Sequence, residues 1–398
     1  GRRTRRRLDA RQTLELVPEI ERQGLLGAHG YGDAWTDDAR LVLRLLHAAV
    51  DAGGAALNYV CVDEILRLGG RAAGAALRDV LSGACSEVQA RAIVNAAGPA
   101  ADQLRAGSGV TPKLRPLRGS HLLLPNWRLP LAQAVAFFHP HDRRPIFAYP
   151  WLGAVLAGTT DLDHCEDPAV EAAISAQEAA YLIAGLRFQF PRSDLTLHDA
   201  SAAFAGVRPV LLGGHAEPSR ESRDHLILRE QGLVTAIGGK LTTFRPLALA
   251  ALRAACAETG MRANFEPRPV FSPAAQPTAP ALAPAMRRRL AGRYGRWAQD
   301  VVDAARGDEF DPVGASEFLW CELRWAARAE SVEHLDDLLL RRTRVGLLTP
   351  EGGARYLPRV REICASELGW DDARWQREAT EYRVRWRRAY AAEHGDAV

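Results

Sequence analysis

The sequence lacks any long apolar run and any closely spaced pair of cysteines. No apolar stretch approaches the ~18 residues that a membrane-spanning helix needs, so any contact with a membrane is expected to be peripheral. The six cysteines are scattered through the chain, which excludes the usual zinc and disulfide patterns and fits a reducing compartment. The basic residues at positions 2–7 are not followed by an apolar core, so they do not form a secretory signal.

Lysine and excess charge are also scarce. The chain carries 51 Lys and Arg residues, but only Lys113 and Lys240 are lysines, and the net charge is just +3. With no motif that combines basic and aromatic residues, nucleic acid is not an expected partner. The remaining composition, 47% hydrophobic and 25% charged, is that of an ordinary globular protein, and 398 residues suffice for two or three domains.

One of the two lysines lies in the most informative stretch of the sequence. An apolar run at 233–237 predicts a buried strand, Gly238 and Gly239 predict a turn, and the run at 247–252 predicts a helix. Thr242 or Thr243 is the expected N-cap of that helix. Such a helix start offers free N–H groups to an anion or to an electron-rich ring edge, and Lys240 adds a positive charge. The alternative is an ordinary β–α turn with a solvated lysine.

A second turn of this type follows the apolar strand expected at 91–94. Its residues Asn95, Ala97 and Gly98 belong to a small-residue segment that permits close approach of the backbone to a ligand, although many β–α turns are built this way. Residues 110–165 instead predict an antiparallel sheet of aromatic-rich strands, which commonly forms the wall of a substrate pocket. His121 begins one of these strands, where a histidine is more often a satisfied core residue than a functional one.

Arginines precede the glycine turn. Arg208 and Arg223 are predicted on turns, where they could clamp a phosphate or carboxylate in bidentate fashion. Because arginine is abundant in this chain, the arginine count by itself favours the alternative that both are surface charges. Further along, residues 264–285 are rich in Pro and Ala and predict a linker, and the pattern beyond them is helical throughout.

The order and spacing of these segments resemble the FAD-dependent glycerol-3-phosphate dehydrogenase family. The matching segments are YGDAWTDDAR at 31–40, VNAAGP at 94–99, GSH at 119–121, GTTD at 158–161, GVRP at 206–209, SRDH at 222–225, GGKLTT at 238–243, WAARAE at 325–330 and LDDLLLRRTR at 335–344. Together they cover the chain from about residue 8 to about residue 385. The last two segments resemble the C-terminal helical cap of that family.

The resemblance implies a flavoenzyme that oxidises sn-glycerol 3-phosphate to dihydroxyacetone phosphate. A hydride would pass from substrate C2 to FAD, and the electrons would continue to a membrane quinone. The family also implies a cytoplasmic protein, bound peripherally to the inner face of the cytoplasmic membrane, that forms a homodimer. No metal is implied.

The resemblance also assigns roles to individual residues. Arg208, Arg223 and Lys240 would bind the substrate phosphate or hold its hydroxyls near the flavin, and His121 is the candidate general base. The backbone around the glycine turn would face the pyrimidine edge of the flavin, and the second turn would approach the ADP portion. The expected cofactor-binding residues are Asn95, Ala97, Gly98, Gly206, Gly238, Gly239, Leu241 and Thr242.

The expected fold class is α/β plus α. An incomplete FAD-binding Rossmann-like domain would be combined with an antiparallel-sheet substrate domain and a C-terminal all-helical domain. The expected boundaries are 1–107 for the first part of the FAD-binding domain, 108–205 for the substrate domain, 206–260 for the returning strand and helix of the FAD-binding domain, 261–285 for the linker and 286–398 for the helical cap.

One departure from the family pattern stands out. The strand–GxGxxG–helix unit that seats the FAD pyrophosphate does not occur in these 398 residues, so about the first hundred residues of the family pattern are expected to be missing. The chain is therefore expected to be a fragment with impaired FAD binding. Two alternatives remain: another FAD-dependent oxidoreductase of the same superfamily that acts on an amine, and a non-catalytic remnant. Equilibrium dialysis with FAD separates the remnant from the enzyme.

Overall fold

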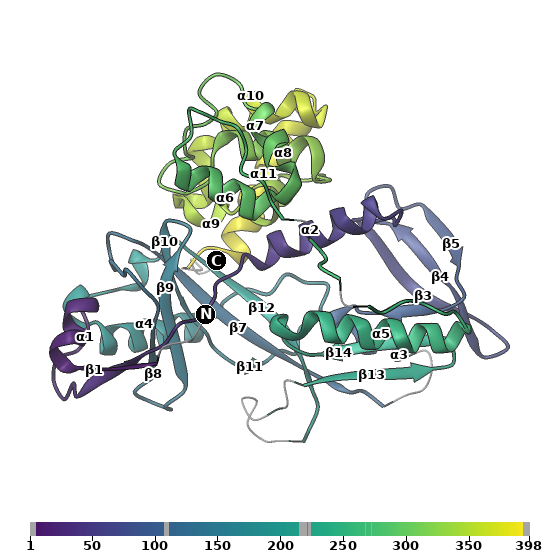
Figure 1. The fold of residues 1–398 in the computed structure, drawn as a ribbon, viewed down its shortest axis with the longest axis horizontal. Coiled ribbons are helices and arrows are strands. Elements are labelled where there is room, and N and C mark those ends of the chain that lie inside the picture. The colour runs from purple at the N-terminus through teal and green to yellow at the C-terminus, as the bar shows by residue number, and fades with distance from the viewer. Residues whose placement is uncertain are drawn as a thin grey trace.

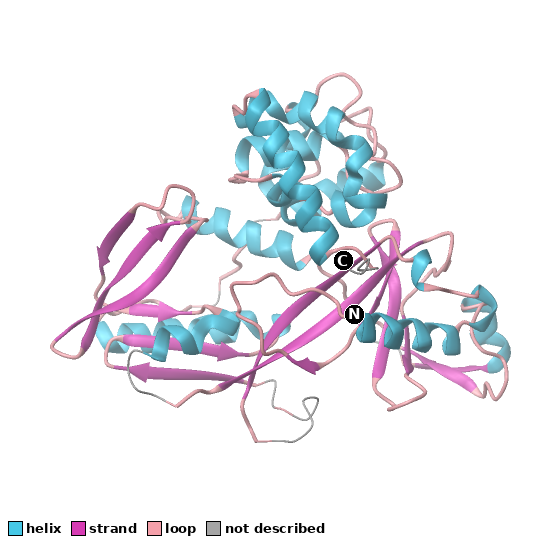
Figure 2. Ribbon diagram, turned by 180° about the vertical axis from the view of Figure 1, so that it is seen from behind, coloured by secondary structure: helices cyan, strands magenta, loops and turns pink. Residues whose placement is uncertain are grey.

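The chain folds into a two-part body with a helical domain packed on top of it (Figure 1). The computed structural model describes residues 5–106, 111–214, 221, 224–266, 268–271 and 273–392. One part of the body is a large antiparallel sheet, and the other contains smaller sheets covered by helices (Figures 1 and 2). This arrangement confirms the expected α/β plus α fold class.

The large sheet is built around one long strand. Its members are β7 (Leu114–Pro125), β8 (Val135–Phe138), β9 (Pro145–Trp151), β10 (Ala154–Gly158), β11 (Leu162–Asp163) and β12 (Ala202–Leu211). β7 pairs with β10, β11 and β12, and every pair in this sheet is antiparallel. Helix α4 (Ala176–Gln189) begins at a Ser175–Glu178 capping box and shares a core with the sheet through side chains such as Leu122 and Leu182.

The first thirty residues belong with this sheet. They form β1 (Arg6–Asp9), α1 (Ala10–Leu16) and β2 (Gly27–Gly30). Val17 and Ile20 are buried in the same core as Leu122, although residues 1–107 were expected to lie in the FAD-binding part. Local sequence pattern does not reveal which apolar surface a short segment will cover.

The second part of the body contains two three-stranded sheets. In one, β14 (Leu233–Gly238) lies between β13 (His225–Glu230), which is antiparallel to it, and β6 (Ile93–Asn95), which is parallel to it. The other consists of β3 (Val60–Leu68), β4 (Arg71–Asp79) and β5 (Cys85–Gln89). The helices of this part are α3 (Ala101–Ala106) and α5 (Phe244–Thr259), and α2 (Asp38–Asp51) lies between the body and the helical domain, which it contacts (Figure 1). The boundary expected between residues 205 and 206 falls inside the continuous strand β12.

The helical domain follows a stretch between α5 and α6 whose described residues form no helix or strand. Its helices are α6 (Pro284–Tyr294), α7 (Ala298–Asp303), α8 (Trp320–Ala329), α9 (Val345–Leu348), α10 (Leu357–Leu368) and α11 (Asp372–Ala389), with a π-helical segment at Asp337–Arg342. Shorter helical turns occur at Gly98–Ala100, Pro191–Ser193, Leu197–Asp199, Leu241–Thr243, Gly295–Trp297 and Pro350–Tyr356.

A continuous apolar core joins the helical domain to the large sheet. Leu123, Trp151 and Leu156 of the sheet are buried together with Phe318 and Leu339 of the helical domain. Burial of apolar surface is the main favourable term in such packing, so the domain is held on the sheet by more than its linker. None of the described helices has the length and apolar character that crossing a bilayer requires.

Candidate active site

The candidate active site lies on one face of the large sheet, where three strands meet. On β7, His121 is opposite Phe204 of β12 on one side and Gly158 of β10 on the other, and Gly119 is opposite Gly206. Because side chains alternate between the two faces of a strand, residues 119 and 121 of β7 share a face with 204, 206 and 208 of β12. The register therefore places His121 and Arg208 on the same surface.

Two glycines make room for these side chains. A Cβ atom at Gly158 would overlap the imidazole of His121, and a Cβ atom at Gly119 would overlap the guanidinium of Arg208. Both side chains can thus lie flat against the sheet backbone. Both glycines belong to segments that resemble the family, 119–121 and 158–161, and the lack of a side chain at each leaves room for Arg208 and His121.

Arg208 is held by the turn that follows β10. Its guanidinium donates to Thr159 Oγ1 (2.9 Å), to the carbonyl oxygen of Thr160 (3.2 Å) and to Asp161 Oδ1 (3.2 Å). These contacts fix the direction of the side chain, which is still 30% exposed. Sequence reasoning assigned no role to Thr159 or Asp161, although the conspicuous GTTD segment contains both.

His121 is kept in its neutral form. Its ring stacks on Phe204 with the centroids 5.0 Å apart, and its Nδ1 is buried without a hydrogen-bond partner among the described residues. Burial lowers the pKa of His121 to about 4, and the positive charge of Arg208 contributes to the same shift. At neutral pH this histidine can accept a proton, but it is a weaker base than a solvated histidine.

The glycine turn lies beside this surface. Gly238 (φ 73°) and Gly239 (φ 91°) take a left-handed backbone that favours glycine, and the N–H of Gly239 donates to Asp224 O at 2.9 Å. The short turn Leu241–Thr243 then leads into α5, and Thr243 occupies the N-cap position. Strand, turn and helix therefore follow in the predicted order. Thr243 stands at the N-cap position, but its hydroxyl bonds the backbone of Lys240 and makes no capping hydrogen bond to the helix.

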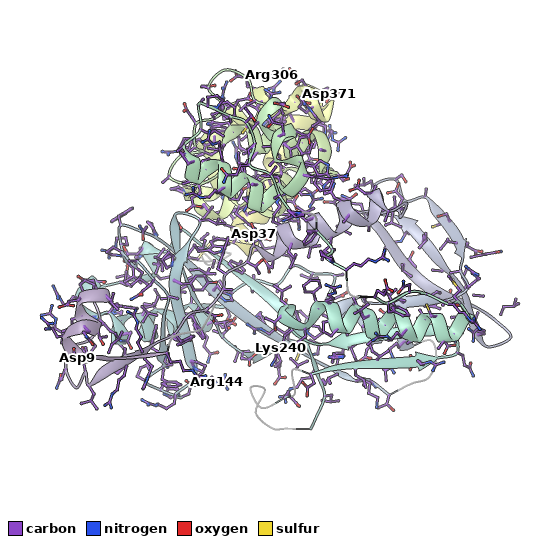
Figure 3. All side chains as sticks on the ribbon, viewed as in Figure 1. Asp9, Asp37, Arg144, Lys240, Arg306 and Asp371 are labelled. Carbon is purple, nitrogen blue, oxygen red and sulfur yellow. The ribbon has the colours of Figure 1, made fainter. Side chains whose placement is uncertain are left out.

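A cavity of about 270 Å³ lies between strand β12 of the large sheet and the glycine turn. It is lined by Val207, Arg208, Pro209, Val210, Gly239 and Lys240. Figure 3 shows Lys240 beside the start of α5. The structure thus brings together two of the three cations predicted to hold the substrate phosphate, and the third, Arg223, lies outside the described residues.

The second predicted turn is at the same edge as the glycine turn. Since β6 and β14 are parallel neighbours, Asn95 and Gly238 both lie toward the carboxyl ends of their strands, where α/β sheets bind ligands. The buried amide of Asn95 shapes this turn: its Nδ2 donates to Ala101 O (2.9 Å), and its Oδ1 accepts from the N–H of Ala97 (3.2 Å). Its contribution to a bound cofactor would therefore be to fix the backbone.

The residues around these turns fit the close approach of a flat cofactor. At the positions where Gly98 and Gly206 would carry a Cβ atom, no heavy atom of the described residues lies within 4 Å. In the turn 241–243 the N–H of Thr243 donates to Lys240 O (2.9 Å), whereas the N–H groups of Leu241 and Thr242 have no partner among the described residues. Leu241 and Thr242 are exposed at this point. This donor set suits the electron-rich edge of a flavin.

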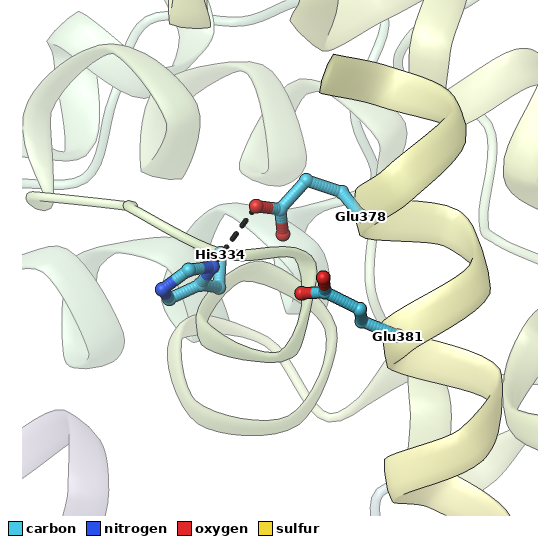
Figure 4. Close-up of side chains that lie close together, drawn as sticks. All are labelled: His334, Glu378 and Glu381. Carbon is cyan, nitrogen blue, oxygen red and sulfur yellow. Dashed lines mark hydrogen bonds and ion pairs between the residues drawn. The ribbon is translucent and has the colours of Figure 1, made fainter. Parts of the chain in front are cut away.

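A separate polar group lies in the helical domain. His334, Glu378 and Glu381 offer three potential metal ligands within 4.8 Å of one another (Figure 4). His334 Nδ1 is 2.9 Å from Glu378 Oε1, and Glu378 Oε2 accepts from the N–H of Leu335 (3.1 Å). These hydrogen bonds satisfy the buried carboxylate by themselves, so we assign no metal to this group.

Fold and site together define a flavin-dependent oxidoreductase architecture, and comparison with known proteins agrees with it. The profile of a family described as "FAD dependent oxidoreductase" matches residues 1–245, and one described as "C-terminal domain of alpha-glycerophosphate oxidase" matches residues 248–375. The chain belongs to the FAD-dependent oxidoreductase family.

Several proteins similar to this chain are named glycerol-3-phosphate dehydrogenases. The chain is 31% identical over 398 residues to glycerol-3-phosphate dehydrogenase 2 of Mycobacterium tuberculosis, covering 94% of this chain and 66% of the relative. It is 37% identical over 245 residues to aerobic glycerol-3-phosphate dehydrogenase of Bacillus subtilis, covering 61% and 44%. The structure of glycerol-3-phosphate dehydrogenase from Bacillus halodurans complexed with FAD is similar at a TM-score of 0.80 and 26% identity, covering 98% and 81%. The chain thus spans about two thirds of the length of the Mycobacterium relative.

Proposed function

We propose that this chain takes part in the FAD-dependent oxidation of sn-glycerol 3-phosphate to dihydroxyacetone phosphate. The cavity where Arg208 and Lys240 meet beside the glycine turn is the observation that carries the proposal. It combines two cations suited to a phosphate with a helix start suited to a flavin edge. The relatives named glycerol-3-phosphate dehydrogenase support the choice of substrate.

Arg208 and Lys240 would bind the phosphate of the substrate. Arg208 already contacts Asp161, so its guanidinium would be shared between that carboxylate and the phosphate. Lys240 is exposed at the rim, and its flexible side chain can follow the ligand. Arg223 is the third proposed contact.

FAD, when bound, supplies the acceptor for the hydride of substrate C2. Around it, the N–H groups of Leu241 and Thr242 would donate to the pyrimidine edge, while Gly206 and Gly98 would allow close approach. His121 would accept the hydroxyl proton of the substrate in its neutral form, and Arg208 would stabilise the negative charge that develops on that oxygen.

A membrane quinone is the proposed acceptor of the electrons, which would bring the protein to the inner face of the cytoplasmic membrane. A homodimer is part of the same proposal. Oxygen consumption measured beside quinone reduction tests the acceptor, and light scattering tests the oligomer.

Two alternatives compete with this proposal. An amine-oxidising flavoenzyme would not need Arg208 and Lys240 at one cavity, and the match of residues 248–375 to the C-terminal domain of alpha-glycerophosphate oxidase favours glycerol 3-phosphate. A non-catalytic remnant would bind no flavin. The visible absorbance of the purified chain, with and without added FAD, decides between enzyme and remnant. Flavin bands that glycerol 3-phosphate bleaches support the enzyme, and a protein that stays colourless after dialysis against FAD contradicts it.

The phosphate site is tested by charge removal at Arg208 and Lys240. We expect Arg208→Gln and Lys240→Ala each to raise the dissociation constant of glycerol 3-phosphate about tenfold or more, because each removes a charge-assisted contact. Isothermal titration calorimetry measures this whether or not the chain turns over.

The controls remove the same charge elsewhere. Arg262→Gln and Lys113→Ala replace exposed residues outside the cavity and should leave the dissociation constant unchanged. An unchanged affinity in Arg208→Gln and Lys240→Ala contradicts the phosphate assignment.

A further inference from the structure

A second cavity, of about 340 Å³, lies between α2 and α6, where the body of the chain meets the helical domain. Leu152 of the β9–β10 turn and the half-exposed Trp35 also line it. It shares no lining residue with the cavity that contains Arg208 and Lys240. Asp37, labelled in Figure 3, marks its position at the start of α2.

Arginine dominates the lining of this cavity. Five arginines face two acids: Arg40, Arg44, Arg288, Arg289 and Arg293 against Asp37 and Glu317. Three of the arginines are paired with carboxylates: Arg40 with Glu330, Arg289 with Glu322 (2.8 Å) and Arg293 with Asp37 (2.5 Å). Glu317 lies 3.6 Å from Arg289. The carboxylates near the cavity therefore neutralise these three arginines and leave the other two without a carboxylate partner.

The other two arginines have no carboxylate in the part of the chain that the structure describes. Arg44 donates to Gly292 O (3.0 Å) and lies over the ring of Phe271, 4.2 Å from its centroid. Burial lowers the pKa of Arg44, because no nearby anion offsets the loss of solvent. Arg288 is exposed and forms no hydrogen bond or ion pair with any described residue. One guanidinium without a carboxylate partner among the described residues thus comes from α2 and the other from α6.

Two buried N–H groups of the paired arginines also lack a hydrogen-bond partner among the described residues. Arg40 is only 4% exposed, and its Nε has no hydrogen-bond partner among the described residues, as is true of Nη2 of Arg289. Buried polar atoms normally have partners. These two atoms have almost no contact with solvent, so they add positive charge behind the cavity but are not themselves within reach of a ligand inside it.

We infer that this cavity binds a phosphomonoester dianion, which contacts Arg44 and Arg288 and so links α2 to α6. Two uncompensated positive charges match a phosphate near charge −2 at neutral pH, and planar guanidinium groups bind phosphate in bidentate fashion. Leu41, Leu152 and Trp35 offer apolar surface to the carbon part of such a ligand. This site is separate from the proposed active site. A bound phosphomonoester would stabilise the contact between the helical domain and the body.

Methyl phosphate is a suitable probe at pH 7.5, with the monoanion methyl sulfate for comparison and chloride used to hold ionic strength constant. We expect saturable binding of methyl phosphate in calorimetry, with methyl sulfate binding more weakly. Arg44→Gln and Arg288→Gln should each raise the dissociation constant about tenfold. Arg383→Gln, which removes an exposed arginine of α11, is the matched control and should bind as the unmodified chain does.

A comparison with Arg208→Gln separates this site from the proposed active site. If methyl phosphate binding is lost in Arg208→Gln but kept in Arg44→Gln and Arg288→Gln, the inference is overturned while the proposed function stands. Absence of saturable binding to the unmodified chain overturns it as well. Arg288 is exposed, so its replacement should not disturb folding, and a circular dichroism melt of each variant verifies this.

Discussion

At the scale of single residues, His121 has the clearest consequence for pH. Its pKa is lowered from about 6.5 to about 4 by burial and by Arg208, so the unfolded chain binds its proton more readily than the folded chain does. Its contribution to stability is therefore complete above pH ~6.5 and is lost as the pH falls toward ~4. The neutral imidazole at working pH is also what the proposed base requires.

We expect this effect to be visible in unfolding experiments. Between pH 7 and pH 5 the free energy of unfolding should fall by up to about 2 kcal/mol more in the unmodified chain than in His121→Gln. Urea titrations at the two pH values measure the difference. His29→Gln, which replaces an exposed histidine, should behave as the unmodified chain does. An equal pH effect in His121→Gln and the unmodified chain would show that the burial of this ring has no energetic consequence.

At the scale of elements, the paired strands β7 and β12 offer two glycines with opposite surroundings. Gly119 lies under the guanidinium of Arg208, whereas the Cβ position of Gly206 is open. We expect Gly119→Ala to displace the flexible Arg208 side chain, raising the dissociation constant of glycerol 3-phosphate about as much as Arg208→Gln does. Its free energy of unfolding should change by no more than about 1 kcal/mol. Calorimetry and urea titration give the two quantities.

Gly206→Ala, on the strand paired with that of Gly119, tests whether a flavin lies against this face of the sheet. No atom of the described residues obstructs a methyl group there, so the stability of this variant should match that of the unmodified chain within about 0.5 kcal/mol. If a flavin lies against this position, the added methyl group should weaken FAD binding in equilibrium dialysis while leaving the direct contacts of Arg208 intact. Full FAD affinity in Gly206→Ala would remove Gly206 from the cofactor-binding residues.

The elements around the glycine turn were predictable because their signals are local. An apolar strand, two glycines and a helix-forming run follow one another within 27 residues, from Leu233 to Thr259, and each obeys its own rule. The contact of Thr159 and Asp161 with Arg208 was not predictable from the residues, because it depends on the register of three strands. For the same reason, the sequence could not reveal which of the many arginines carry a carboxylate partner.

At the scale of the whole molecule, a buried ion pair ties α2 to the helical domain. Arg40 bonds both carboxylate oxygens of Glu330, and its Nη2 also donates to Arg342 O at 2.7 Å. The two side chains are 5% and 1% exposed. The two residues of this pair are almost 300 positions apart in the sequence, so no local sequence pattern predicts their contact. Both residues nevertheless lie in segments that resemble the glycerol-3-phosphate dehydrogenase family.

Arg40→Met should therefore destabilise the chain by about 3–5 kcal/mol, because it leaves the Glu330 carboxylate buried without its partner. The double variant Arg40→Met/Glu330→Leu removes both charges and should recover much of that loss. Arg361→Met, which breaks an exposed pair with Asp372, should cost less than about 1 kcal/mol. Scanning calorimetry measures the stability of all three variants. In Arg40→Met we also expect the melt to separate into two transitions, because the helical domain and the body would then unfold independently. A single transition near that of the unmodified chain would show that the apolar core around Trp151 and Phe318 holds the two parts together without this ion pair.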